Sequence, residues 1–314
     1  MITALIIAGV VLFGLGATTG HLVHEAERTH PPAGRFVTAG GLRQHAIELG
    51  KAEGSGKPAI VMIHGAYGAA GDFAASLMPA VADDFHAIAI DRPGHGYTER
   101  GETVPVTPAR QAAYLHAALR EMKIERPILL GFSYGGAVAL AYALEHPEDV
   151  AALVLVSPAS HPWRSRPDMP FGMADIPLVG PLLTHTIVTP AGHLLKDRGI
   201  SGVFGSGDVP EEFSNAPVSL SLRPGSYAAN AEDIRILNGF LQQQAPRYPA
   251  LRMPVVIVAS EDDPSVSADI HARALARDIA GAELLLSPDG GHPLHFSKPG
   301  LVLEAIRRAA VRAR

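Results

Sequence analysis

Six short runs of aliphatic residues constrain the fold of this chain more than any other feature of its sequence. Each run is apolar at nearly every position, and segments with helical patterns or turn residues separate the runs. The runs occupy residues 59–65, 86–91, 126–132, 151–157, 254–260 and 282–287. Strands that are apolar on both sides are typical of a parallel sheet with helices on both faces. The sequence therefore predicts an α/β fold with a doubly wound parallel sheet.

The segments between the runs agree with this prediction. Helical patterns lie at 108–122, 134–146 and 299–314. Pro108 stands near the start of the first helix, where its missing N–H costs no hydrogen bond, and the second helix stops before Pro147. Hydrophobic residues make up 47% of the 314 residues, which supplies a substantial core and excludes extensive disorder.

One long segment interrupts the alternation. Residues 158–250 contain 12 of the 26 prolines and no clear strand pattern. We expect an inserted cap of short helices and loops there, with residues 35–157 and 251–314 forming the core domain. The apolar stretch 176–188 within it has two interpretations: it packs onto the sheet, or it forms a lid over a pocket for an apolar part of the substrate.

The N-terminal segment is apolar and uncharged. Residues 1–23 contain no Asp, Glu, Lys or Arg, and about 20 such residues are enough to cross a bilayer as a helix. We predict a membrane anchor that contacts the bilayer through residues 2–23, followed by a linker at 24–34. Two alternatives stay open. The segment is a cleaved signal, which would give a secreted or periplasmic protein, or it packs on the protein itself.

A single serine among glycines is the first chemical signal. The pentapeptide at 131–135 is Gly-Phe-Ser-Tyr-Gly, the G-x-S-x-G pattern of a nucleophile elbow. A sharp turn from strand to helix strains the serine backbone and leaves no room for side chains two residues away on either side. Because a predicted strand precedes this turn and a predicted helix follows it, we assign Ser133 as the nucleophile.

A serine hydroxyl needs a base, and the base needs a carboxylate that orients it. Two loops that follow later strands supply both groups. Asp262 and Asp263 follow the run at 254–260, and His292 follows the last run. We prefer Asp263 to Asp262, and His292 to His295, while noting that the aspartates also suit a turn or helix cap. The order Ser, Asp, His agrees with the order expected for this type of sheet.

The oxyanion of an acyl-transfer intermediate requires two N–H donors. We assign the backbone amide of Tyr134, directly after the serine, and that of Ala66 in the glycine-containing loop at 64–68, with Tyr67 as the second choice. His64 is interpreted as a structural histidine that is hydrogen-bonded to loop backbone.

The segment at 91–98 follows the run at 86–91 and also carries polar side chains. We interpret Asp91 and Arg92 as a structural pair that braces this turn. His95 receives no role.

From about residue 34 to the C-terminus, the chain resembles the α/β-hydrolase superfamily. The motifs that carry the resemblance occur in the superfamily's order: HGAYG, DRPGHGYT, GFSYGG, ASEDDPSV and GGHPLHF. The resemblance implies an eight-stranded, mostly parallel sheet with a helical cap inserted after the sixth strand. It also implies the roles already assigned to Ser133, Asp263 and His292, and to the amides of Ala66 and Tyr134.

These observations predict a serine hydrolase that cleaves a carboxylic ester with an apolar portion through an acyl-enzyme. Members that dehalogenate or open epoxides carry a carboxylate at the elbow, so Ser133 argues against both reactions. A C–C bond hydrolase, a perhydrolase or an acyltransferase of the same fold stays open, as does a non-catalytic binding module.

Composition narrows the partners. The net charge is −5 and no basic tract is present, which gives no reason to expect nucleic acid. The absence of cysteine excludes disulfides and a thiol nucleophile. The expected partner is a small-molecule ester, and the expected mechanism requires no metal or organic cofactor.

Overall fold

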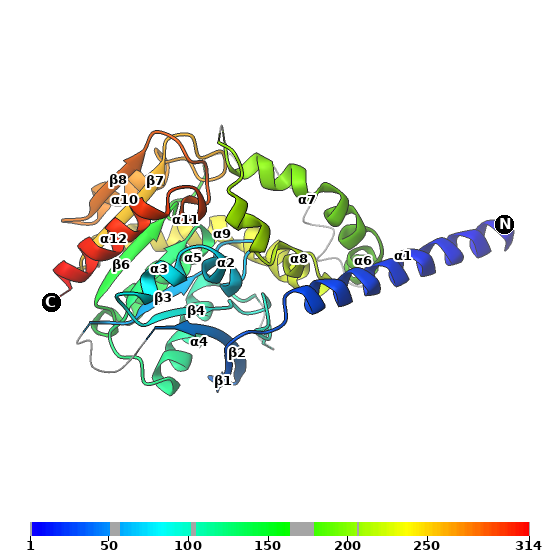
Figure 1. Cartoon of the computed structure of the whole chain (residues 1–314), viewed down its shortest axis with the longest axis horizontal. Helices are drawn as coiled ribbons and strands as arrows, with labels where there is room; N and C mark the ends of the chain where they lie inside the picture. The colour runs from blue at the N-terminus through cyan, green and yellow to red at the C-terminus, as the bar shows by residue number, and fades with distance from the viewer. Residues whose placement is uncertain (1, 51–56, 102–104, 164–178, 206, 314) are drawn as a thin grey trace.

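The computed structural model contains one eight-stranded sheet with helices on both faces (Figure 1). It describes all residues except 1, 51–56, 102–104, 164–178, 206 and 314. The side chains of residues 4, 5 and 8 are likewise not described. The strand order is β1-β2-β4-β3-β5-β6-β7-β8. The strands are β1 (Arg35–Ala39), β2 (Leu42–Leu49), β3 (Ile60–Ile63), β4 (Ala87–Ile90), β5 (Ile128–Phe132), β6 (Ala152–Val156), β7 (Val255–Ser260) and β8 (Glu283–Ser287).

All six predicted strands are present, as β3 to β8, and they pair in parallel. The sequence pattern did not reveal β1 and β2, which form an antiparallel hairpin at the edge of the sheet. Both strands are partly exposed, so polar residues interrupt their apolar pattern. The predicted α/β fold with an eight-stranded, mostly parallel sheet is confirmed.

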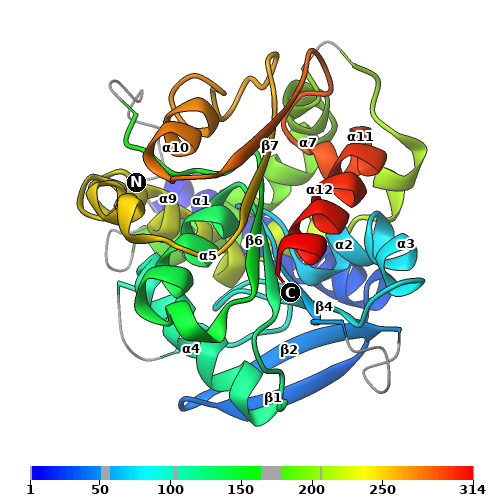
Figure 2. The same cartoon turned by 90° about the vertical axis from the view of Figure 1, so that its left-hand side faces the viewer.

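Two sets of helices cover the two faces of the sheet (Figure 2). Helices α4 (Pro108–Glu121), α5 (Tyr134–Glu145), α9 (Pro224–Gln244) and α10 (Ala272–Asp278) contribute to the core on one face. Helices α2 (Ala70–Ala75), α3 (Met78–Ala82), α11 (Leu294–Ser297) and α12 (Pro299–Arg312) contribute to the core on the other. The three predicted helices correspond to α4, α5 and α12.

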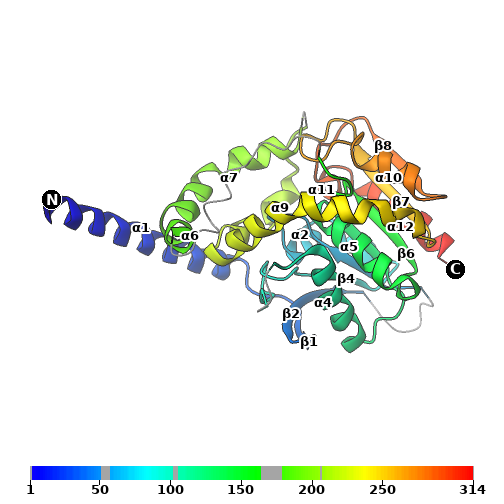
Figure 3. The ribbon, with the colours of Figure 1, turned by 180° about the vertical axis from the view of Figure 1, so that it is seen from behind.

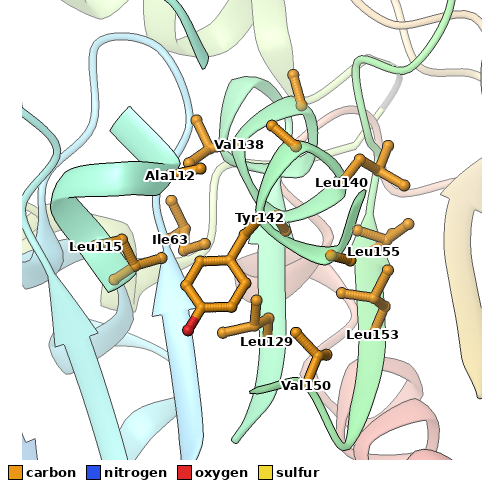
Figure 4. Packing of buried hydrophobic residues seen from close by; sticks show 14 of the residues in the cluster. Ile63, Ala112, Leu115, Leu129, Val138, Leu140, Tyr142, Val150, Leu153 and Leu155 are labelled. Carbon is orange, nitrogen blue, oxygen red and sulfur yellow. The ribbon is translucent and has the colours of Figure 1, made fainter. Parts of the chain in front are cut away.

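Alternate residues of each strand enter opposite halves of the core. Leu129 of β5 packs with α5 on one face, while its neighbours Ile128 and Leu130 pack on the other. Figure 4 shows Leu140 and Tyr142 of α5 over strand residues of the first half. Each fully buried Leu or Ile contributes about 1.5–3 kcal/mol. The α5 packing therefore fixes the position of the turn that precedes the helix.

The chain between β6 and β7 contains the inserted helices, a name used here for α6 (Val179–Leu183), the π-helical turn η3 (Thr184–Val188), α7 (Thr189–Val203), α8 (Val218–Ser221) and α9. Helices α7 and α9 run along opposite sides of this part of the molecule (Figure 3). Of the apolar stretch 176–188, residues 176–178 lie outside the described part, and the remainder forms α6 and η3. The cap boundaries and the lid function stay predictions.

The N-terminal segment forms one long helix, α1 (Ile2–Thr29), whose first half projects from the molecule (Figure 1). Among the helices, as far as their residues are described, none has the length and apolar character that crossing a membrane requires. The predicted membrane-spanning anchor at residues 1–23 is therefore not supported. The predicted linker at 24–34 begins inside this helix, because the helix extends to Thr29. Within this part of the helix, Ala26 is buried and Glu25 pairs with Arg28 one turn later.

Candidate active site

Ser133 lies in the turn between β5 and α5. Its backbone has φ 52° and ψ −117°, a strained conformation for a residue with a side chain. A Cβ atom on Gly135 would lie 2.1 Å from the carbonyl oxygen of Ile63, and one on Gly131 would lie 2.6 Å from that of Gly135. Both glycines are therefore required by close backbone contacts, as the sequence pattern indicated.

The structure brings the three predicted side chains into one hydrogen-bond chain. His292 Nε2 lies 2.9 Å from Ser133 Oγ, and His292 Nδ1 lies 2.7 Å from Asp263 Oδ2. The Ser133 hydroxyl can donate to Nε2 when the Nδ1 proton is donated to the carboxylate. Ser133 and His292 are each 9% exposed, so the hydroxyl is shielded from bulk water but reachable from the adjacent cavity.

Asp263 uses its two carboxylate oxygens for different tasks. Oδ1 accepts the backbone N–H groups of Ser265 and Val266 at 2.8 and 2.9 Å, which leaves Oδ2 for His292. Asp263 therefore has both predicted roles: it caps the turn that follows it, and it lies against the imidazole of His292. The turn contacts fix the carboxylate, and the fixed carboxylate orients the imidazole.

Asp262, the competing carboxylate, has another position. Its Oδ1 accepts the backbone N–H of Gly291 at 2.9 Å and the Ser260 hydroxyl at 2.5 Å. Asp262 therefore holds the loop that carries His292 and does not contact the imidazole in the hydrogen bonds of the described residues. The backbone of His292 is held further by Val203 of α7 and by the Ser157 hydroxyl.

His295, the competing histidine, is buried, and its Nδ1 has no hydrogen-bond partner in the described part of the chain. Burial and the nearby His292 lower the pKa of His295 to about 3. Its ring packs against Phe132 and Phe73. The residue therefore behaves as a neutral core side chain.

The loop after β3 approaches Ser133 with two candidate N–H donors. The amide of Tyr67 is already used, since it donates to Asn230 Oδ1 of α9 at 2.8 Å. No such acceptor is present for the amides of Ala66 and Tyr134 among the described residues. The geometry thus favours Ala66 over Tyr67 as the oxyanion donor. Asn230 gave no sequence signal, because it is distant in the chain.

Arg92 stabilises the loop after β3 through hydrogen bonds to its backbone. Its guanidinium donates to the carbonyl oxygens of His64 and Gly65, each at 3.1 Å, and lies 4.3 Å from the centre of the Tyr134 ring. It also pairs with Asp233 of α9 at 2.5 Å, and both side chains are at most 1% exposed. Arg92 therefore connects both candidate oxyanion donors to the inserted helices.

The predicted pairing of Asp91 with Arg92 is wrong. Asp91 instead bonds His45 and accepts the amides of Ala70 and Tyr97. Adjacent side chains at the end of a strand point to opposite sides, so the two residues brace different loops.

His64 has the predicted structural role. Its Nδ1 bonds the carbonyl oxygen of Gly65, and its Nε2 accepts the amide of Arg92. Burial and the charge of Arg92 hold its pKa well below the usual value.

A cavity of about 550 Å³ opens beside Ser133 and His292. Its wall combines core residues with residues of the inserted helices. The apolar side chains that line it include Trp163, Ile200, Val203, Phe213, Val218, Leu222, Ile234, Leu237 and Phe296. One carboxyl side chain, Asp72, and one amine side chain, Lys196, also line it. The wall thus suits a largely apolar molecule with a carbonyl group at Ser133.

Asp72 and Lys196 gave no signal in the sequence. Asp72 is 9% exposed. Burial raises its pKa to about 7, against the lowering effect of the Ala69 amide. Lys196 is exposed on α7 and has no ion pair within the described residues. Only the tertiary structure places these residues at the cavity.

Among the residues that the structure describes, one group of side chains has ligand atoms close enough for a metal ion: His116, His146 and Asp149. The rings of the two histidines stack 3.8 Å apart and nearly parallel, at 6°. A metal ion binds in the plane of an imidazole ring, so two stacked rings do not present their nitrogens to one ion without rotating. The group lies at the end of α5 opposite Ser133 and has no part in the site.

Two named proteins are similar to this chain in sequence. The chain is 29% identical to a 2-hydroxy-6-oxononadienedioate/2-hydroxy-6-oxononatrienedioate hydrolase of Klebsiella pneumoniae over 273 residues, which are 84% of this chain and 91% of that protein. It is 40% identical to a probable 1-acylglycerol-3-phosphate O-acyltransferase of Oryza sativa over 106 residues, which are 32% of this chain and only 25% of that protein.

The solved structures and the family models give two further comparisons. The enol-lactonase from Burkholderia xenovorans LB400 superposes with a TM-score of 0.72 at 20% identity, over 88% of this chain and 100% of that one. At that identity the likeness shows the fold alone. The model of a protein family that is described as having the alpha/beta hydrolase fold matches residues 58–299 of this chain. The chain, with its elbow between β5 and α5, therefore belongs to the α/β-hydrolase family.

Proposed function

We propose that this hydrolase cleaves carboxylic esters through an acyl-enzyme on Ser133. The observation that supports the proposal most directly is the hydrogen-bond chain from Ser133 through His292 to Asp263. A serine at a strained turn, a base within hydrogen-bond distance and a fixed carboxylate are the parts that nucleophilic acyl transfer requires.

The geometry gives each residue a step. Ser133 Oγ attacks the carbonyl carbon while His292 Nε2 takes its proton, and Asp263 stabilises the imidazolium that forms. The amides of Ala66 and Tyr134 bind the oxyanion. His292 then returns the proton to the leaving alcohol. In the second half, His292 takes a proton from a water molecule as the water oxygen attacks the acyl-enzyme. His292 then gives this proton to Ser133 Oγ as the bond to the acyl group breaks, which releases the acid and free Ser133.

The substrate class follows from the cavity. Its apolar wall supports an ester with an apolar acyl or alcohol portion, since burial of each CH₂ group contributes about 0.8 kcal/mol. A preference for short, charged acids in a panel of esters would contradict this part of the proposal.

A second reaction has specific support. The relative from Klebsiella pneumoniae, which this chain matches over most of its length, is named as a hydrolase of 2-hydroxy-6-oxo dicarboxylates. Lys196 is a cation at the cavity wall that can face a substrate carboxylate. Cleavage of a C–C bond next to a ketone in such an acid is therefore the alternative reaction.

Labelling with a fluorophosphonate tests the proposal. Wild type should be labelled covalently, and Ser133→Ala should not, although it keeps the fold as judged by circular dichroism. An unlabelled wild-type protein would support a non-catalytic binding module instead. Product analysis with an ester and a 2-hydroxy-6-oxo acid then separates the two reactions. Ester hydrolysis yields an acid and an alcohol, whereas C–C bond hydrolysis yields an enol and an acid that contains the former ketone carbon.

A further inference from the structure

Exposed apolar side chains are concentrated in one region of the molecule. Twelve of the fifteen large hydrophobic side chains that are exposed in the described part of the chain belong to α1 or to the segment from α6 to α7. They are Ile2, Ile6, Ile7, Val10, Val11, Leu12 and Phe13 of α1, and Val179, Leu182, Ile187, Leu194 and Leu195 of the inserted helices. These twelve side chains are called the apolar surface below.

The two parts of this surface adjoin each other. The second half of α1 packs against η3, α7 and α8, and Thr19 of α1 and Thr184 and Thr186 of η3 are buried. Figures 1 and 3 both show α1 beside α6 at the same end of the molecule. The first half of α1 then continues beyond this contact.

The two sequence segments that carry the apolar surface contain no acidic side chain and no basic side chain other than histidine. The sequence from residue 2 to 24 and from 179 to 195 contains no Asp, Glu, Lys or Arg. Charged residues border both segments: Glu25 and Glu27 follow on α1, and Lys196, Asp197 and Arg198 follow on α7. An uncharged apolar zone bounded by charged residues matches the change from hydrocarbon to headgroups in a bilayer.

The exposure of α1 discriminates between possible occupants. The described side chains of residues 2–14 are exposed on every side of the helix. Packing against a second copy of the chain, or in a protein groove, would cover one stripe of this helix and leave the remainder in water. Lipid covers a helix on all sides. We propose that the apolar surface binds the face of a lipid bilayer, with the first half of α1 embedded in it.

The position of the surface also bears on the substrate, and this step rests on the proposed function. Helix α7 carries Leu194 and Leu195 on the apolar surface, whereas its residues Ile200 and Val203 line the cavity beside Ser133. One helix therefore separates the bilayer from the site. Esters dissolved in the bilayer are the substrate class that this arrangement favours, because they reach the cavity without crossing water.

Sedimentation with phosphatidylcholine vesicles tests the binding. Phe13→Glu and Leu195→Glu each place a charge on the apolar surface, at side chains that are 80% and 61% exposed. The matched control is Val311→Glu on α12, where the side chain is 66% exposed and lies outside the surface. We expect at least about a tenfold loss of vesicle partitioning in the first two variants, and wild-type partitioning in the control and in Ser133→Ala.

Activity separates binding from chemistry. Phe13→Glu should hydrolyse a short soluble ester like wild type but lose rate on a long-chain ester presented in vesicles. Equal partitioning of Phe13→Glu and Val311→Glu would overturn the proposal. The proposal would also be overturned if light scattering showed that wild type is a dimer and the dimer did not bind vesicles, since a second copy would then cover the apolar surface. Vesicle binding without hydrolysis would retain this proposal and reject the proposed function.

Discussion

Arg92 provides the sharpest test of how the oxyanion loop is positioned. The variant Arg92→Met keeps most of the side-chain volume but removes the charge and all of the guanidinium donors. It removes the side-chain donor of the His64 carbonyl oxygen, one of the two side-chain donors of the Gly65 carbonyl oxygen, and one partner of the buried Asp233. Both the stability of the protein and its catalysis should therefore decrease.

The expected losses of stability and of kcat follow from the burial and the remaining partners of Asp233 and from the role of the Ala66 amide. Breaking a buried ion pair by removing one partner costs about 3–5 kcal/mol. Asp233 retains Arg100 at 2.8 Å and Gln111 at 3.2 Å, which favours the lower end of that range. Because a domain has about 5–15 kcal/mol of total stability, the variant should still fold. Displacement of the Ala66 amide removes one oxyanion donor, for which we expect kcat to fall by about 10²–10³-fold.

The assay combines urea unfolding with steady-state hydrolysis of a neutral p-nitrophenyl ester. The matched control is Arg100→Met, which pairs with the same Asp233 but is 20% exposed and bonds Pro93 and Glu232 instead of the oxyanion loop. The control should lose less stability and keep its kcat. If Arg92→Met lost stability but kept kcat, Arg92 would be a structural residue with no part in positioning the donor amide.

Three further outcomes are expected. Native Asp72, with a pKa raised by burial to about 7, keeps a proton that the unfolded chain releases from about pH 4 upward. The free energy of unfolding should therefore fall between these values as pH rises, by on the order of 4 kcal/mol, and Asp72→Asn should flatten the fall in urea titrations at pH 5 and 8. His292→Leu should lower kcat by on the order of 10⁶-fold, whereas His295→Leu, which replaces an unpaired buried nitrogen, should keep activity and stability; equal losses would refute this difference. Lys196→Gln should leave neutral esters unaffected and slow acidic substrates by about two- to fivefold, measured as kcat/KM; a uniform loss would indicate a structural role.

The strands and the elbow could be predicted because their signals are local. A parallel strand buried on both faces must be apolar at every position, as in the run at 151–157, and a strained serine needs glycine two residues away on both sides. The edge strands β1 and β2 were missed because partial exposure removes that pattern. The prediction of a membrane-spanning anchor gained no support, because no helix among the described residues has the length and apolar character needed to cross a bilayer.

The sequence by itself determined which residues are available for the chemistry: a strained serine, two adjacent aspartates and two histidines in the order that this fold uses. Only the tertiary structure decided among them. It placed Asp263 and His292, not Asp262 and His295, in one hydrogen-bond chain with Ser133. It also occupied the amide of Tyr67 with Asn230 and put Arg92 under the oxyanion loop. These choices depend on contacts between residues that are distant in the chain, and no local pattern encodes such contacts.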